Sequence, residues 1–234
     1  MNNVVIVDAV RTPIGKRNGG LSTLHPGETL GLVQKALIER TGIDPAEVEQ
    51  VVGGVVSQAG EQAFNLTRTA WLGAGLPLTT AATTVDTQCG SSQQATGLAA
   101  SLVGSGVVDA AMACGVEAMS RVPIGASGSK KLGLGVPIPP PYFDQYEMTS
   151  QFEGAERIAD KWEITREDAD AFGLASQQRA IKAWEEDRFA GQYIEVVAPD
   201  VDQEGEPTGA SHTVGRDEGL RETTIEKLAT LKPV

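Results

Sequence analysis

The chain has 234 residues, 41% of them hydrophobic, and a formal net charge of −12 at pH 7. This length can form one large domain or two small ones, and the negative charge argues against nucleic acid, whose phosphates need a basic surface. No apolar run is long enough to cross a membrane, and residues 1–7 lack the basic and apolar regions of a signal peptide. We therefore expect a cytoplasmic protein without membrane insertion.

Cysteine and histidine are scarce. Two cysteines, Cys89 and Cys114, argue against a disulfide scaffold in a chain with no export signal. Together with His25 and His212 they show no metal-ligand spacing, so no metal site is expected. Cys114 falls in an apolar run and is expected to be a buried small residue. We interpret His25 as a helix cap or surface residue and His212 as a solvated residue of a polar loop.

Strand-like and helix-like patterns alternate from residue 4 to residue 113. The continuous apolar run Val4–Val7 is typical of a strand covered on both faces. Residues 51–56 form a second such run, in which Gly53 and Gly54 indicate close approach of another backbone. Because strands alternate with helices, we expect an α/β layer with a largely parallel sheet. Further strands are predicted at 83–85 and 107–113, and helices at 27–40, 45–48 and 64–72.

Residues 83–95 form the stretch on which the predicted chemistry depends. The β-branched residues Thr83, Thr84 and Val85 suit a strand, and the small side chains after Cys89 lead into a helix. The thiol would therefore lie at a strand-to-helix turn, where the positive end of the helix dipole should lower its pKa toward neutrality. Because thiolate is the nucleophilic form, we predict that Cys89 is a nucleophile. A buried structural cysteine is the alternative.

The sequence changes character after about residue 120. Residues 125–147 are rich in glycine and proline and predict a long loop. A near capping box that starts at Thr165 marks the beginning of one helix, and residues 199–219 are acidic and turn-rich. Two helices are predicted, at about 151–162 and 166–187. We therefore expect two domains, a core domain over residues 1–120 and a largely helical domain over residues 121–234.

Four ordered segments resemble motifs of the thiolase family, the 3-ketoacyl-CoA acetyltransferases. Residues 86–94, Asp-Thr-Gln-Cys-Gly-Ser-Ser-Gln-Gln, are similar to the motif around the acylated cysteine. Three features are most similar to actinobacterial thiolases of steroid side-chain degradation: the Gly-Glu-Gln run at 60–62, the Cys-Gly-Ser-Ser-Gln-Gln form of this motif, and residues 154–159. The other three segments are residues 7–16, similar to the opening strand and turn; residues 114–120, similar to the GGxExMS segment with Cys114 in place of a glycine; and residues 216–233, similar to the end of the loop domain.

The resemblance implies a thiolase-like fold, a layered α/β core domain with an inserted, mainly helical loop domain. It also implies an acyltransferase that cleaves 3-ketoacyl-CoA, releases acetyl-CoA and leaves a shortened acyl group on Cys89 before its transfer to free coenzyme A. The backbone N–H of Cys89 is a candidate oxyanion donor. Coenzyme A would be a co-substrate, with no covalently bound cofactor, in lipid or steroid side-chain degradation.

For coenzyme A the resemblance points to the loop domain. Arg221 matches an arginine that contacts the adenine nucleotide in the family, and arginine can both pair with phosphate and stack on a purine. An exposed arginine without any contact is the alternative. Ser150 and Gln151 fall where the family lines its pantetheine tunnel. Weaker candidates are Arg216, Lys130 and Lys131, whereas Trp71 and Trp184 are expected to be core residues.

Three further motifs of the family do not occur in these 234 residues. They are a Gly-His-Pro histidine, a Cys-x-Gly cysteine and an Asn-Glu-Ala-Phe segment. The chain therefore resembles the N-terminal half and loop domain of a thiolase, and we expect it to be inactive alone. A relative that binds acyl-CoA without cleaving it is an alternative, and a ketoacyl-synthase-like condensation is a third. Residues 125–147 resemble the loop that joins dimers into tetramers, so a homodimer or homotetramer is expected.

Overall fold

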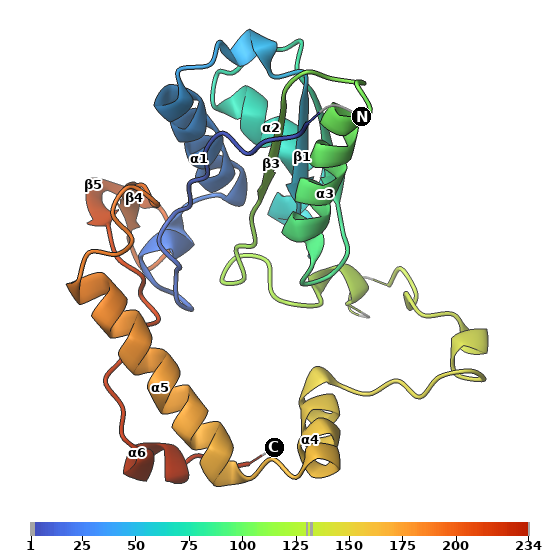
Figure 1. Cartoon of the computed structure of the whole chain (residues 1–234), viewed down its shortest axis with the longest axis vertical. Helices are drawn as coiled ribbons and strands as arrows, with labels where there is room; N and C mark the ends of the chain where they lie inside the picture. Colours follow the sequence, from blue (N-terminus) through green and yellow to red (C-terminus); the bar gives the residue numbers. More distant parts are fainter. Residues whose placement is uncertain (1–2, 130, 132, 234) are drawn as a thin grey trace. The chain divides into compact units, whose positions relative to one another are not determined.

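The computed structural model describes residues 3–129, 131 and 133–233. The chain divides into two compact units, Met1–Ser129 with Gly191–Glu218 and Lys130–Ala190 with Gly219–Val234 (Figure 1). These units differ from the two domains expected from the sequence, chiefly because residues 191–218 fold with the first unit. Each unit is described separately below.

A three-stranded parallel sheet forms the centre of the first unit. Its strands are β1 (Gln50–Gly54), β2 (Ala81–Val85) and β3 (Ala111–Gly115), in the order β2-β1-β3. The last residue of β1, Gly54, pairs in register with Val85 on one side and Gly115 on the other. The carboxyl ends of all three strands therefore lie along one edge of the sheet, and the loops that follow them share that edge.

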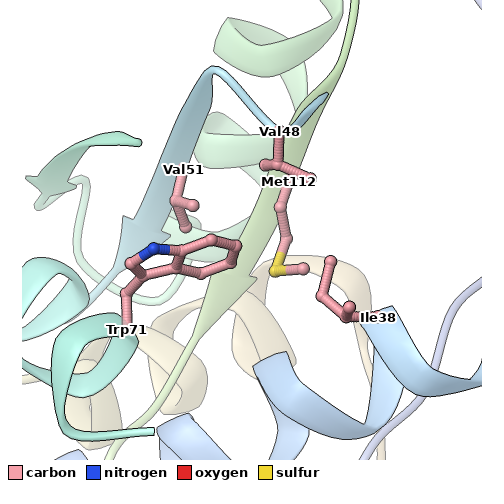
Figure 2. Close-up of a cluster of buried hydrophobic side chains, with 5 residues drawn as sticks. All are labelled: Ile38, Val48, Val51, Trp71 and Met112. Atoms are coloured by element: carbon pink, nitrogen blue, oxygen red, sulfur yellow. The ribbon is translucent and has the colours of Figure 1, made fainter. Parts of the chain in front are cut away.

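Helices cover both faces of this sheet. Successive side chains of a strand point to opposite faces, and Val51 and Val52 of β1 therefore mark the two sides. Val51 packs with Ile38 and Trp71 (Figure 2), whereas Val52 packs with the alanine side of the third helix. The confirmed architecture is a layered α/β core. The helices are α1 (Pro26–Thr41) and α2 (Leu66–Gly73) on the Val51 side and α3 (Ser91–Gly104) on the Val52 side.

Helix α1 begins and ends where its local sequence dictates. His25 is the N-cap; its Nδ1 accepts a hydrogen bond from the Gly27 N–H at 3.0 Å, and Glu28 completes the capping box. The helix ends at Gly42, whose φ of +68° is the left-handed conformation that glycine adopts without strain. The interpretation of His25 as a cap is confirmed.

The predicted strand at Val4–Val7 is wrong. These residues form no strand, and the side chains of Val5, Ile6 and Val7 are exposed. A strand needs a hydrogen-bonded neighbour, and no strand in the described part of the chain pairs with this run; an apolar run alone does not specify one. Pairing begins later, where Arg11 exchanges backbone hydrogen bonds with Gln192 and Ile194. Strand β3 also starts at Ala111, later than predicted.

An antiparallel hairpin occupies the region predicted to be only acidic and turn-rich. Its strands are β4 (Val196–Val201) and β5 (Pro207–Val214), with Val196 opposite Val214. Val196 and Ala198 are buried against Leu24, so the hairpin packs on the segment that precedes α1. The β-branched residues at its start signalled the hairpin, but the acidic residues of the turn obscured them.

The second unit is mainly helical, as expected. Its helices are α4 (Gln151–Trp162), α5 (Arg166–Glu185) and α6 (Ile225–Ala229). Thr165 forms the predicted capping box with Asp168, and the Arg166 side chain donates to the Leu228 carbonyl, which joins α5 to α6. The described part of residues 125–147 contains only single turns of 3₁₀ helix. The short 3₁₀ helices of the chain include Gly20–Thr23, Pro45–Glu47, Gly60–Gln62, Ala126–Gly128 and Pro140–Tyr142.

Candidate active site

Cys89 lies at the carboxyl edge of the sheet, in the turn between β2 and α3. Its side chain is exposed. The next residue, Gly90, is the N-cap of α3 and offers no side-chain acceptor to the first N–H groups of the helix, so the positive end of the helix dipole remains uncompensated by a cap beside the thiol. The strand-turn-helix placement predicted for Cys89 is confirmed.

Local hydrogen bonds define the turn around Cys89. The Asp86 carboxylate accepts from the Gln88 N–H at 2.7 Å. The Ser91 hydroxyl accepts from the Thr87 N–H at 3.0 Å and donates to the Gln88 carbonyl at 2.5 Å. Gln88 has φ +54°, the left-handed conformation that costs a residue with a side chain some energy. These hydrogen bonds therefore hold Gln88 and Ser91, the residues on either side of the Cys89–Gly90 pair.

Two glycines let the start of α3 approach the sheet closely. A Cβ atom on Gly54 would lie 2.4 Å from the Ser92 nitrogen, and a Cβ atom on Gly115 would lie 2.0 Å from the Ser92 Oγ. A Cβ on Gly53 would likewise collide with Thr67. The predicted close backbone approach is confirmed at Gly54, where it places the end of the Cys89 turn directly against β1, whereas at Gly53 the close neighbour is the Thr67 side chain.

A carboxylate links the loops that follow β1 and β3. Glu117 accepts hydrogen bonds from the backbone N–H groups of Val56 and Ser57, at 2.8 and 3.2 Å, and from the Gln62 side chain at 3.0 Å. Gln62 in turn accepts from the Ala118 N–H at 2.8 Å. The sequence placed Glu117 in a motif but assigned it no role. Because three donors occupy its oxygens, it orders the edge of the sheet beside Cys89.

The second cysteine belongs to the core. Cys114 packs against the cluster around Trp71, and its Sγ lies 3.6 Å from the Gln34 amide nitrogen. Burial raises the pKa of the Cys114 thiol to about 11, so it is protonated near neutral pH. The predicted packing role is confirmed, although Cys114 is partly and not fully buried by its exposed surface. Trp71 is fully buried as expected.

The interpretation of His212 as a solvated loop residue is wrong. His212 lies in β5, where its Nδ1 is 2.5 Å from the Asp200 carboxylate and its Nε2 is 3.0 Å from the Gly20 carbonyl oxygen. The hydrogen bond to Asp200, followed by that to Gly20, raises the pKa of His212 above its ordinary value of 6.5. His212 thus ties the hairpin to the segment before α1.

In the second unit, Arg221 lines a hollow of about 340 Å³ between α5 and the start of α6. The Arg221 N–H donates to the Gln177 side chain at 3.2 Å. The hollow combines cationic, amide and hydroxyl groups with the carboxylate of Glu222 and the apolar side chains of Leu174 and Ile181, so a ligand there could meet both polar and apolar groups. Its other lining residues are Leu174, Gln178, Ile181, Glu222, Thr223, Thr224 and Lys227.

Of the other predicted coenzyme A residues, those that the structure describes do not line this hollow. Ser150 is the N-cap of α4 and accepts from the Glu153 N–H at 3.1 Å, and Gln151 is the first residue of that helix. Arg216 belongs to the first unit. Lys131 is exposed, and Lys130 lies outside the described residues. Trp184 packs against Phe189 with ring centroids 5.4 Å apart.

Two features are absent from residues 3–129, 131 and 133–233, the part of the chain that the structure describes. No helix in that part of the chain is long and apolar enough to span a membrane. Among the same residues, no group of three or more acidic, cysteine or histidine side chains is placed to hold a metal ion.

Comparison with known proteins identifies the class. The model of the thiolase N-terminal domain matches residues 4–234, and the chain therefore belongs to the thiolase family. It is 38% identical to the steroid 3-ketoacyl-CoA thiolase FadA6 of Mycobacterium tuberculosis, over 100% of this chain and 56% of that protein. The beta-ketoadipyl-CoA thiolase of Pseudomonas putida is also 38% identical, over 100% of this chain and 60% of that protein.

A solved structure supports the fold. The acetyl-CoA acetyltransferase of Bacillus anthracis superimposes with a TM-score of 0.83 at 34% identity, over 100% of this chain and 59% of that one. The thiolase-like α/β fold expected from the motifs is confirmed. The chain thus spans 56–60% of the length of these relatives.

Proposed function

We propose that the protein carrying this chain is an acyltransferase that cleaves 3-ketoacyl-CoA by thiolysis. The observation that carries the proposal is the exposed Cys89 in its full motif, at the turn between β2 and α3. The names of the relatives, which include a steroid thiolase and other 3-ketoacyl-CoA thiolases, favour lipid or steroid side-chain degradation. No covalently bound cofactor is needed for this reaction.

The reaction divides into two acyl transfers at Cys89. The thiolate attacks the 3-keto carbon, the C2–C3 bond breaks, and its electron pair passes to acetyl-CoA, which takes up a proton as it leaves. The shortened acyl group stays on sulfur until the thiol of free coenzyme A attacks it and Cys89 leaves as thiolate. The Cys89 N–H is the proposed donor to the oxyanion formed in each step. The motifs of this chain supply no group for the proton transfers.

We assign coenzyme A, the co-substrate, to the second unit. Arg221 supports this assignment because it lines the hollow beside α5, where a guanidinium can pair with phosphate or stack on adenine. Lys227 adds a second cation to the same hollow. Ser150 and Gln151 are proposed pantetheine contacts on the family resemblance alone.

A homodimer or homotetramer is proposed for the assembled protein, in the cytoplasm. Support for the tetramer comes from the loop at 125–147, which exposes Phe143 and Tyr146 around Tyr142. Exposed aromatic clusters of this kind are typical of protein contact surfaces.

The test is thiolysis by the full-length protein with acetoacetyl-CoA and a longer 3-ketoacyl-CoA, comparing wild type with Cys89→Ser. We expect turnover in wild type and a loss on the order of 10³-fold in the variant. Wild-type protein that binds coenzyme A but turns over neither substrate would favour the alternative, an acyl-CoA binding protein, and would contradict the proposal.

A further inference from the structure

We propose that Ser91 is a positioning residue for the Cys89 nucleophile, acting through the turn that carries the thiol. This inference rests on the proposed function, because it assigns a role in the thiolysis reaction. It concerns the buried hydroxyl two residues after Cys89, whose hydrogen-bond partners are backbone groups of Thr87 and Gln88.

The first observation is the direction of the Ser91 hydrogen bonds. Ser91 is the first residue of α3, one position after the N-cap Gly90. Its hydroxyl accepts from the Thr87 N–H and donates to the Gln88 carbonyl, both of which precede Cys89. The hydroxyl therefore serves the turn before the nucleophile and not the helix after it.

The second observation is that the turn needs a restraint. Gln88, immediately before Cys89, has φ +54°, a conformation that a residue with a side chain adopts only when its surroundings hold it there. Asp86 holds the N–H of Gln88, and Ser91 holds its carbonyl. The Gln88 carbonyl also accepts from the Ser91 N–H at 3.0 Å. Loss of the hydroxyl would therefore remove one of two restraints on this carbonyl and leave the Thr87 N–H without its side-chain acceptor.

The third observation is that Ser91 is tightly packed. Ser91 is only 3% exposed. A Cβ atom added to Gly54 would lie 2.5 Å from the Ser91 carbonyl carbon. The start of α3 is thus pressed against β1. A fixed hydroxyl holding a strained turn sets the direction of the thiol, and small errors in the placement of a reacting group cost large factors in rate.

The experiment compares Ser91→Ala with wild type in the full-length protein. The matched control is Ser101→Ala, an exposed serine of the same helix whose hydroxyl bonds only to the Gly97 carbonyl among the contacts described. The first readout is the rate of Cys89 alkylation by iodoacetamide between pH 6 and 9, followed on the Cys89 peptide by mass spectrometry. The second readout is kcat and KM for acetoacetyl-CoA thiolysis.

For Ser91→Ala we expect about tenfold slower alkylation at every pH and about tenfold lower kcat, with KM changed less than twofold. Ser101→Ala should match wild type in both readouts. Ser91→Thr, which keeps a hydroxyl, should retain most of the wild-type alkylation rate and kcat. Ser91→Val, which has the shape of threonine but no hydroxyl, should not. The Thr and Val variants carry the comparison if Ser91→Ala fails to fold.

Two outcomes separate this inference from the proposed function. If Cys89 of the wild-type protein is alkylated no faster than N-acetylcysteine, Cys89 is not an activated nucleophile. The proposed function would then fail together with this inference. The role of Ser91 would be overturned, with the proposed function intact, by either of two results. In the first, wild-type Cys89 is alkylated fast and Ser91→Ala changes that rate by less than twofold. In the second, Ser91→Thr and Ser91→Val are alkylated at equal rates.

Discussion

At the scale of single residues, Cys89 and Cys114 show how position decides the chemistry of the same side chain. Cys89 is exposed at the start of α3, where a substrate can reach its sulfur. Cys114 is packed against the core, and burial raises its pKa to about 11. In an alkylation experiment near neutral pH, Cys114 therefore serves as an internal unreactive thiol against which Cys89 is measured.

Arg221 provides a test of the coenzyme A assignment. Arg221→Ala should weaken coenzyme A binding by about tenfold or more, because a hydrogen bond to a charged group contributes about 1.5–3 kcal/mol. Isothermal titration with coenzyme A measures the change. The control is Arg179→Ala, an exposed arginine of α5 that does not line the hollow. Equal affinities for Arg221→Ala and wild type would rule out the assignment.

His212 should make the stability of the first unit depend on pH. Its pKa is raised on folding, so protonated His212 favours the folded state. The stabilisation is complete below the unfolded pKa of about 6.5 and is lost as the pH rises through the folded pKa. Urea unfolding at pH 5.5 should give a larger free energy of unfolding for wild type than for His212→Gln. At pH 8.5 the difference between the two free energies should be smaller. A difference independent of pH would contradict this account.

At the scale of elements, the contact between α3 and β1 depends on Gly54. Gly54→Ala should lower the free energy of unfolding by about 1–3 kcal/mol, because the new Cβ would collide with the Ser92 backbone nitrogen at 2.4 Å. Gly97→Ala is the matched control within α3. Nothing lies within 4 Å of its added Cβ, so it should be neutral or stabilising by up to about 1 kcal/mol.

Thermal or urea unfolding of both variants measures the contrast. Equal effects of the two substitutions would show that α3 is free to shift away from the sheet. If Gly54→Ala also slows the alkylation of Cys89, the packing of α3 against β1 is connected to the site at the start of that helix.

The same elements show what sequence alone can predict. The Cys89 turn was predictable because a β-branched run changes to small residues within a few positions, and such a local signal fixes a local structure. The prediction for Val4–Val7 was wrong because an apolar run is compatible with a strand but does not specify the strand with which it would pair. The hairpin at 196–214 was missed because acidic residues such as Asp200 and Asp202 dominated its composition.

Long-range contacts were beyond prediction for a different reason. Glu117 reaches Val56 and Gln62 across more than fifty residues, and His212 reaches Gly20 across 192. Neither pairing leaves a periodic or compositional trace near either partner. The predicted roles of these residues could therefore not go beyond motif membership for Glu117 and a solvated loop for His212.

At the scale of the whole molecule, the chain joins two compact units with different proposed tasks. The first unit carries Cys89 at the edge of its parallel sheet, and the second carries the hollow around Arg221. The chain belongs to the thiolase family and spans 56–60% of the length of the relatives described above. Thiolysis therefore has to be tested in the full-length protein.

The most direct test of the central claim is to trap the acyl group on Cys89. The full-length protein is mixed with a 3-ketoacyl-CoA in the absence of free coenzyme A, quenched in acid and digested for mass spectrometry. We predict that the peptide containing Cys89 gains the mass of the shortened acyl group, that added coenzyme A removes it, and that Cys89→Ser shows none. Folded protein whose Cys89 stays unmodified, or an acyl group on another residue, would contradict the account.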